Sequence, residues 1–262
     1  PRLRPALPGA ALGESVPQFD ITNKIEILAI YTFLYQEKEK GFFFKGEAHE
    51  LLELVYVDKG VLHNVVDGND TQLAQGEMMI YGKGLWHMQY ADVDMEVSFI
   101  TISFELNSDT PGQLLNRRIP LDAEMVRLLR GMLSEREKNN RYSGDLIVCS
   151  LQLLLLSVLQ YENAQPKLKT PSTLHNENAV VNAALSFISA NVYQKLSVPF
   201  VARQCNISAS RLTTLFQKRL SVTPGEFIRR IKLEESKTLI RNGEYSFSET
   251  ASRLKYSSVQ QF

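Results

Sequence analysis

The chain has 262 residues, of which 44% are hydrophobic and 22% charged, a composition typical of folded globular proteins. Its zero net charge excludes a uniformly basic or acidic protein. Two cysteines, Cys149 and Cys205, are too few for a disulfide framework and indicate a reducing, cytoplasmic setting, in which we expect both to be buried.

The N-terminal stretch carries no fold signal. Residues 1–20 are rich in Pro, Ala and Gly and do not begin with Met, so we interpret them as a disordered tail or the edge of a fragment. We find no secretory signal. The most apolar run, 151–159, is too short to cross a bilayer.

Residues 21–162 form the first predicted domain, which begins with strands. The segments 51–57, 61–66, 77–81 and 93–104 are rich in Val, Ile, Leu, Tyr and Phe, and Gly- and Asp-containing turns separate them. One of these turns is 67–70. Short strands at close spacing predict a small antiparallel β-barrel.

Two helices are predicted to follow the barrel, over 121–138 and 145–161. The second is apolar on nearly all sides, so several of its faces need a cover. Either the barrel and a second copy of the chain share it, or it is wholly buried in its own domain. Residues 163–176 have the composition of a linker and separate this domain from an all-helical one, 177–262.

The helical domain contains an internal repeat and is basic. Its run LSVPFVARQCNIS (196–208) aligns with YSFSETASRLKYS (245–257), so one supersecondary unit is used twice. Residues 195–262 carry 12 Lys and Arg against 5 Asp and Glu, a net charge of +7, which leaves −7 for the rest. A basic domain beside an acidic one indicates that this end contacts a polyanion.

The first unit is interpreted as a helix-turn-helix. Ser197 is predicted to cap the first helix, Asn206 to adopt the left-handed turn conformation, and Ser208 to cap the second helix. The apolar side chains of the second helix share one face. The short hydroxyls, an Arg, an amide and a Lys suit a major groove and its phosphates; they are Ser208, Ser210, Arg211, Thr213, Thr214, Gln217 and Lys218. A generic helical bundle is the alternative to this interpretation.

A single helix is predicted to join the two units. Thr223-Pro224-Gly225-Glu226 is a capping box with Pro in the first turn, and Asn242-Gly243 is a stop signal. Ser246 and Glu249 form a second capping box, which opens the second unit. A rigid helix would hold the two units at a fixed separation.

This ordered pattern resembles the AraC family of transcription regulators. The resemblance implies tandem helix-turn-helix motifs that bind adjacent major grooves, with Ser210, Arg211, Thr213 and Thr214 facing bases in the first unit. In the second unit Ser258 corresponds to Ser208, and Gln260 and Gln261 would face bases. Lys255 replaces the usual turn glycine, and the sequence ends one turn into the second recognition helix, so we expect a truncated chain.

The strand region resembles a cupin, the sensor domain of AraC-type regulators. The resemblance rests on His49-x-x-x-Glu53 with a later Gly60, and on Gly76, Gly82 and Gly84 before His87. Two His and one carboxylate raise the alternative of a metal-dependent cupin enzyme fused to a DNA-binding tail. Glu47 stands where metal cupins usually have a further His, so we assign no metal, cofactor or catalytic residue.

A small-molecule effector, for which a sugar is one candidate, is the favoured ligand of the barrel. Aromatic faces with polar tips suit such a ligand; the predicted binding residues are His49, Glu53, Tyr56, Tyr81, Trp86 and His87. A dimerisation module with a vestigial pocket is a further alternative. The predicted protein is therefore an α+β, effector-responsive, homodimeric DNA-binding regulator in the cytoplasm. RNA polymerase is a further candidate partner.

Overall fold

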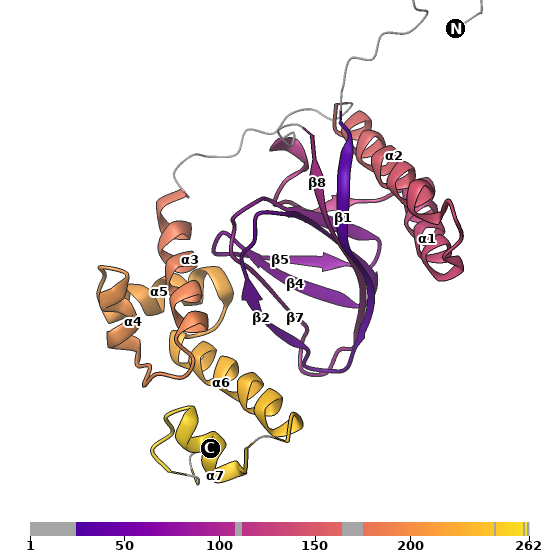
Figure 1. Cartoon of the computed structure of the whole chain (residues 1–262). Helices are drawn as coiled ribbons and strands as arrows, with labels where there is room; N and C mark the ends of the chain where they lie inside the picture. Colours follow the sequence, from indigo (N-terminus) through magenta and orange to yellow (C-terminus); the bar gives the residue numbers. More distant parts are fainter. Residues whose placement is uncertain (1–24, 108–111, 164–174, 244, 259, 261) are drawn as a thin grey trace, which may run out of the picture.

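The computed structural model describes residues 25–107, 112–163, 175–243, 245–258, 260 and 262. These residues form an N-terminal β-barrel domain, two helices and a C-terminal helical domain (Figure 1), which confirms the predicted fold class. The predicted tail, 1–20, and most of the predicted linker lie outside the described residues. The helix before the linker ends at Asn163, and the helix after it begins at His175, inside the predicted linker range.

The barrel consists of two antiparallel sheets. One has the strand order β1-β8-β3-β6-β9 and the other β2-β7-β4-β5. The strands are β1 (Ile27–Lys38), β2 (Phe43–Glu47), β3 (Leu52–Lys59), β4 (Val61–Val66), β5 (Asn69–Ala74), β6 (Glu77–Tyr81), β7 (His87–Tyr90), β8 (Val97–Leu106) and β9 (Ile119–Pro120).

Two of the sequence-based boundaries were wrong in this region. The turn expected over 67–70 is confined to Asp67 and Gly68, both at positive φ, and β5 begins at once with Asn69. Two left-handed residues make the tight hairpin turn that suits the twist of the strands. The strand expected over 93–104 begins at Val97, because Val93 lies in an exposed loop.

Side-chain alternation decides what each strand contributes. On β3, Leu52, Leu54 and Tyr56 belong to a core between the five-stranded sheet and the two helices. Val55 and Val57 point the other way, into the core between the sheets. Successive residues of a strand face opposite sides, so Glu53 lies on the interior side with Val55.

The two helices α1 (Ala123–Lys138) and α2 (Ser143–Asn163) cover the outer face of the five-stranded sheet (Figure 1). Asp122 caps α1, and Asn139 ends it in the left-handed conformation. By length and composition alone, α2 could cross a membrane, contrary to the expectation from the shorter run. One side of α2 is nevertheless core, since Leu151, Leu154 and Leu155 have no exposed surface.

The C-terminal domain covers the outer face of the four-stranded sheet, on the other side of the barrel (Figure 1). Its helices are α3 (His175–Ala190), α4 (Val198–Gln204), α5 (Ala209–Leu220), α6 (Pro224–Arg241) and α7 (Phe247–Arg253). Phe43 and Met88 from the sheet join the same buried cluster as Phe227 of α6. The rings of Phe43 and Phe227 lie 6.2 Å apart, edge to face.

Candidate functional site

The first helix-turn-helix unit has the predicted caps and turn. Ser197 Oγ accepts the N–H of Phe200 at 3.3 Å, and Ser208 Oγ accepts the N–H of Arg211 at 3.1 Å. Asn206 has a φ of 55° at the turn between α4 and α5. Each cap satisfies a backbone donor that the first turn of a helix leaves free, so the sequence itself fixes where both helices begin.

Helix α5 divides into a buried face and an exposed face. Leu212, Leu215, Phe216 and Leu220 pack into the domain core. The predicted DNA-facing side chains of this unit lie outside that core. Those that are exposed are Ser208, Ser210, Arg211, Thr214, Gln217 and Lys218, and Thr213 is half-buried. The predicted set is therefore brought together on one accessible side of one helix.

An acidic residue that the sequence analysis missed lies among the cations of α5. Glu177, in the first turn of α3, accepts Arg211 Nη2 at 2.6 Å, and Lys218 Nζ and Arg219 Nη2 at 3.0 Å each. Hydrogen bonds from Lys218, Arg219 and Arg211 lower the pKa of Glu177 to about 2. No sequence pattern pairs a first-turn Glu with side chains 34 to 42 positions away.

Helix α6 joins the two units as predicted. Thr223 and Glu226 form its capping box, and Gly243, at a φ of 70°, follows its end. Ser246 and Glu249 form the second capping box at the start of α7. Lys255 has a φ of 57° where the family pattern has glycine. Ser258 and Gln260 are exposed, and Gln261 lies outside the described residues.

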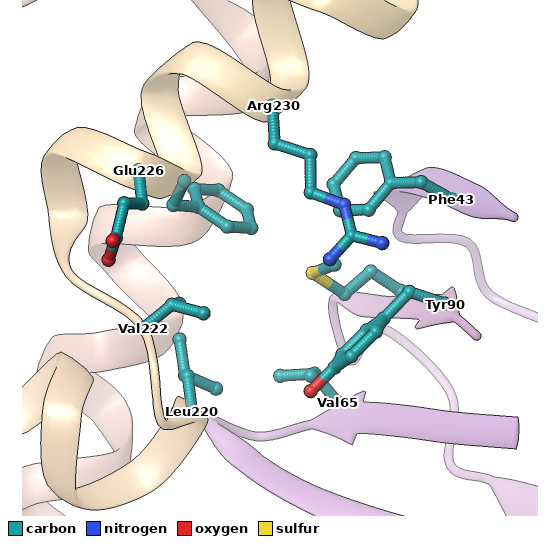
Figure 2. Close-up of a pocket in the computed structure, with 9 residues that line it drawn as sticks. Phe43, Val65, Tyr90, Leu220, Val222, Glu226 and Arg230 are labelled. Carbon is teal, nitrogen blue, oxygen red and sulfur yellow. The ribbon is translucent and has the colours of Figure 1, made fainter. Parts of the chain in front are cut away.

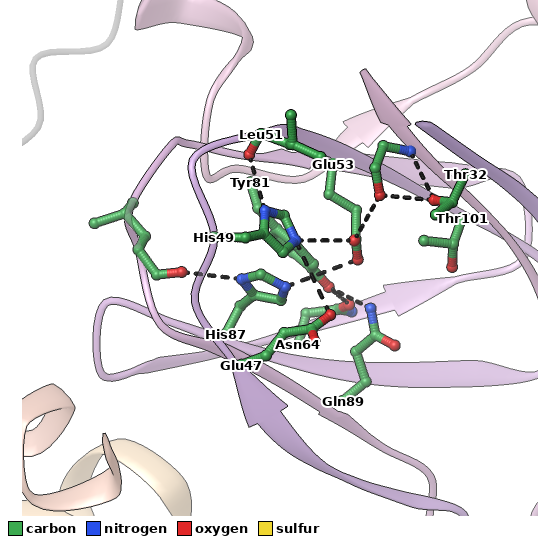
Figure 3. A network of polar contacts seen from close by, with 12 residues as sticks. Thr32, Glu47, His49, Leu51, Glu53, Asn64, Tyr81, His87, Gln89 and Thr101 are labelled. Atoms are coloured by element: carbon green, nitrogen blue, oxygen red, sulfur yellow. Dashed lines mark hydrogen bonds and ion pairs between the residues drawn. The ribbon is translucent and has the colours of Figure 1, made fainter. Parts of the chain in front are cut away.

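Inside the barrel, His49, Glu53, His87 and Glu47 form a polar cluster (Figure 3), with ligand-capable atoms all within 4.8 Å of one another. His49 Nε2 lies 3.3 Å from Glu53 Oε2, and His87 Nε2 lies 3.8 Å from Glu53 Oε1. Both histidines direct Nδ1 at backbone carbonyls, those of Leu51 and Leu85. Their Nε2 atoms are therefore turned toward the carboxylates.

Burial shifts the pKa values of His87 and Glu53 in this cluster. It lowers the pKa of His87 to about 4, so His87 is neutral near pH 7. Burial also raises the pKa of Glu53, against the opposing effects of the His49 charge and the Ser103 hydrogen bond. Among the described residues, His87 Nε2 is buried without a hydrogen-bond partner. A buried, neutral, unpartnered imidazole nitrogen is suited to accept a hydrogen bond or bind a metal ion.

A pocket of about 320 Å³ opens beside the cluster. It contains His49 and Glu53 from the predicted set. It is also lined by Glu47, considered above only in connection with a metal, and by residues with no predicted role: Thr32, Leu34, Gln36, Lys38, Phe42, Phe44, Leu51, Gln89, Thr101 and Ser103. Six of these residues occupy alternate positions of β1 and β8, so the alternation of these two strands is the signal that could have found them.

Three predicted aromatic residues take other places. Tyr56 lies in the core beneath α1 and α2, on the opposite side of β3 from Glu53. Trp86 packs in the cluster between the barrel and the C-terminal domain. Tyr81 is buried behind the pocket, where its ring lies tilted against that of His87 with the ring centres 4.5 Å apart, and its hydroxyl donates to Asn64 and accepts from Gln89.

A second cavity, of about 190 Å³, lies at the junction of the two domains (Figure 2). Arg230 of α6 reaches across it, with its guanidinium carbon 4.5 Å from the ring centre of Phe43 and 5.0 Å from that of Tyr90. Cation–π contacts of this kind stabilise more when they are shielded from water. Arg230 thus connects α6 to strands β2 and β7.

Similarity to known proteins agrees with these features. Residues 201–262 match the family model described as "Helix-turn-helix domain". The chain is 22% identical over 219 residues to the uncharacterized HTH-type transcriptional regulator YdiP of Escherichia coli K12, covering 80% of this chain and 72% of that one. It is 21% identical to the Msm operon regulatory protein of Streptococcus mutans, covering 92% and 87%. The solved structure of ToxT from Vibrio cholerae is similar at 13% identity and a TM-score of 0.40, over 90% of each chain.

The C-terminal domain is therefore a DNA-binding helix-turn-helix domain, with two capped units joined by α6. Together with the ordered signature in 208–257 and the barrel before it, these similarities agree with the resemblance of the chain to AraC-type transcription regulators.

The junction also contains a titratable network around His63. Its Nδ1 lies 2.9 Å from Asp70 Oδ2 and its Nε2 lies 3.5 Å from Asp92 Oδ1, while its ring stacks on Tyr90 at 4.2 Å. Burial alone would lower the pKa of His63, but hydrogen bonding and the charges of Asp70 and Asp92 raise it above the ordinary value.

Protonated His63 should therefore stabilise the folded chain. Because the pKa of His63 is higher in the folded chain than in the unfolded chain, protonation of His63 adds to the free energy of unfolding. This contribution is fully present below about pH 6.5, the unfolded pKa, and is lost as the pH rises through the folded pKa. We expect the free energy of unfolding, measured with urea from pH 6 to pH 9, to fall more for wild type than for His63→Gln. Asp92→Asn should give an intermediate slope, and identical slopes would contradict this assignment.

Proposed function

We propose that the chain controls transcription in the cytoplasm by reading specific DNA through α5 while the barrel binds a small polar effector. The observation that carries the DNA-reading part is the exposed face of α5. It combines one Arg, short hydroxyls and one amide on a helix that its caps hold rigidly. Arg suits the paired acceptors of guanine, whereas Lys218, at the end of the helix, suits a phosphate.

The first test separates base reading from phosphate contact. A duplex selected by the wild-type chain from a random library is compared with an unselected duplex by fluorescence anisotropy. Arg211→Ala should lose about 1–3 kcal/mol of binding free energy on the selected duplex and little on the unselected one, because a base contact forms only with the matching sequence. Lys218→Ala should weaken both duplexes alike.

Arg127→Ala is the matched control for this test. It removes an Arg whose side chain is 75% exposed on α1, in the barrel domain, and that pairs with Glu124. It should leave both affinities unchanged. Retention of full sequence preference by Arg211→Ala would show that the reading face lies elsewhere.

The pocket in the barrel supports a polar effector such as a sugar. Its walls supply hydroxyls and amides from Thr32, Gln36, Gln89 and Thr101, and ring faces from Phe42 and Phe44. A volume of about 320 Å³ is at the small end of ligand sites. Polar groups placed between apolar faces are the combination that a carbohydrate ring and its hydroxyls require.

The same strands connect the pocket to the C-terminal domain. On β2, Phe44 lines the pocket while its neighbour Phe43 packs on Phe227 of α6. On β7, Gln89 lines the pocket while Tyr90 contacts Arg230. We propose that an effector acts by shifting these two strands, which would change how α6 and the attached readers are held.

A metal ion is the second candidate ligand, favoured by the buried, unpartnered Nε2 of His87. Glu47, His49, Glu53 and His87 would hold it, and the backbone carbonyls that orient both rings suit metal-binding histidines. A bound first-row divalent ion would supply a Lewis acid or a bridge to an effector. This site is also the one that a metal-dependent enzyme would use.

Thermal unfolding distinguishes these ligands. A sugar at 100 times its Kd should stabilise wild type by about 2.7 kcal/mol. Thr101→Val, which exchanges a pocket hydroxyl for a methyl, should lose most of that effect. Thr71→Val, on β5 and not among the pocket-lining residues, is the matched control. No shift with any member of a mono- and disaccharide panel would exclude the sugar effector.

The same assay with Mn²⁺, Ni²⁺ and Zn²⁺ addresses the metal. Stabilisation by one of these ions that His87→Gln removes and Thr101→Val keeps would identify the ion as the ligand. If no ion stabilises the wild-type chain, the metal hypothesis fails, and with it the enzyme alternative.

We also propose a homodimer formed through α2. Its outward side carries Leu146, Leu153 and Tyr161, which are 50%, 51% and 41% exposed. Cys149, expected to be buried, lies exposed on the same helix. Leu146 and Leu153 are seven residues apart, so they lie on one face, and a face of this kind in a coiled coil is covered by a second helix.

Sedimentation velocity tests this interface. Wild type is expected to sediment as a dimer and Leu153→Asp as a monomer, because a buried unpaired charge would oppose association. Val93→Asp places the same charge on an exposed apolar residue (83%) away from α2 and should remain dimeric. A dimeric Leu153→Asp would rule out α2 as the interface.

A further inference from the structure

The carboxylate of Glu177 occupies the middle of the positive charge on α5. Its Oε1 lies 2.6 Å from Arg211, and its Oε2 lies 3.0 Å from both Lys218 and Arg219. Glu177 comes from α3, a different helix from all three cations. One carboxylate thus offers both oxygens to three cations, as a phosphate group offers its oxygens to the cations that bind it.

Two of these three cations belong to the proposed DNA face. The side chains of Arg211 and Lys218 are 52% and 56% exposed, and that of Glu177 is 25% exposed. An N–H group that donates to Glu177 is not free to donate to DNA, so the contacts of Arg211 Nη2 and Lys218 Nζ with Glu177 oppose their contacts with DNA. We propose that Glu177 competes with DNA for Arg211 and Lys218, with a phosphate in the case of Lys218, and thereby sets the DNA affinity of the chain.

The barrel contacts the same cluster. Arg219, whose side chain is 11% exposed, donates to Asn69 Oδ1 at 3.4 Å as well as to Glu177. Asn182 of α3 donates to Asp67 Oδ1 at 3.4 Å. The β4–β5 hairpin thus contacts both helices that hold the Glu177 cluster. The docked arrangement of the two domains and the engagement of Glu177 with α5 therefore stabilise each other.

The decisive variant is Glu177→Gln in the full chain, since it removes the charge and keeps the shape. The probe is a fluorescent duplex of random sequence, because phosphate binding does not depend on sequence. We expect roughly three- to tenfold tighter binding at low salt. The slope of log K against log salt should steepen by about 0.9 for each additional phosphate that the freed cations neutralise. Glu177→Asp, which keeps the charge, should bind like wild type.

Glu124→Gln is the matched control. It removes the same charge from an α1 residue that is 83% exposed and pairs with Arg127. The affinity and the salt slope should both stay unchanged. A thermal melt of each variant verifies that it is folded at the assay temperature.

The inference rests on the proposed DNA-reading role of α5, and Lys218→Ala tells the two apart. If Glu177 competes with DNA, Lys218→Ala should lower the DNA affinity more in the Glu177→Gln background than in wild type, because Lys218 is free to bind phosphate once the Glu177 charge is gone. If folded Glu177→Gln binds DNA no more tightly than wild type while Lys218→Ala still lowers the DNA affinity, the competition is overturned but the role of α5 is not. Glu177 is then a positioning residue. No effect of Lys218→Ala in either background overturns the reading role of α5 as well.

Discussion

The architecture depends on one constraint: both sheets of the barrel are apolar on their outer faces as well as on their inner ones. Leu54 and Tyr56 need a cover on one side of the barrel, and Phe43 and Met88 need one on the other. Helices α1 and α2 supply the first cover and the C-terminal domain supplies the second. A sheet buried on both faces has few places for polar side chains, so the polar pocket residues collect inside the barrel near its open edge.

This arrangement brings the helix-turn-helix domain into direct contact with the barrel. Neighbouring residues of β2 and β7 face opposite sides of the sheet. The pocket and the domain junction are therefore separated only by the backbone of these two strands. At that junction the guanidinium of Arg230 lies between the rings of Phe43 and Tyr90 (Figure 2). A change of side-chain packing in the pocket therefore has a short physical path to α6, and α6 carries both helix-turn-helix units.

Local signals predicted the C-terminal domain well. Ser197, Ser208 and Thr223 were recognised as caps from sequence because capping is chemistry between residues two or three positions apart. Asn206 was recognised because few residue types tolerate its turn conformation. The face of α5 followed from the helical period once its start was fixed.

The barrel was harder to predict, because aromatic composition does not say which way a side chain points. Tyr56 was grouped with Glu53, but residues three positions apart in a strand face opposite sides of the sheet. The strand alternation could therefore have excluded Tyr56 from the pocket. Trp86 adjoins His87 in sequence yet lies on the side of the domain junction. Glu177 had no local signal, since its partners are brought to it by the packing of α3 on α5.

In the proposed complex, α5 contacts DNA and the barrel does not. Hydrogen–deuterium exchange of the full chain, with and without a saturating duplex, tests it most directly. Bound DNA is expected to slow exchange in the amides of 208–219 and to leave exchange in β3 and β8 unchanged. Slowed exchange in the barrel strands with no change in 208–219 would contradict it.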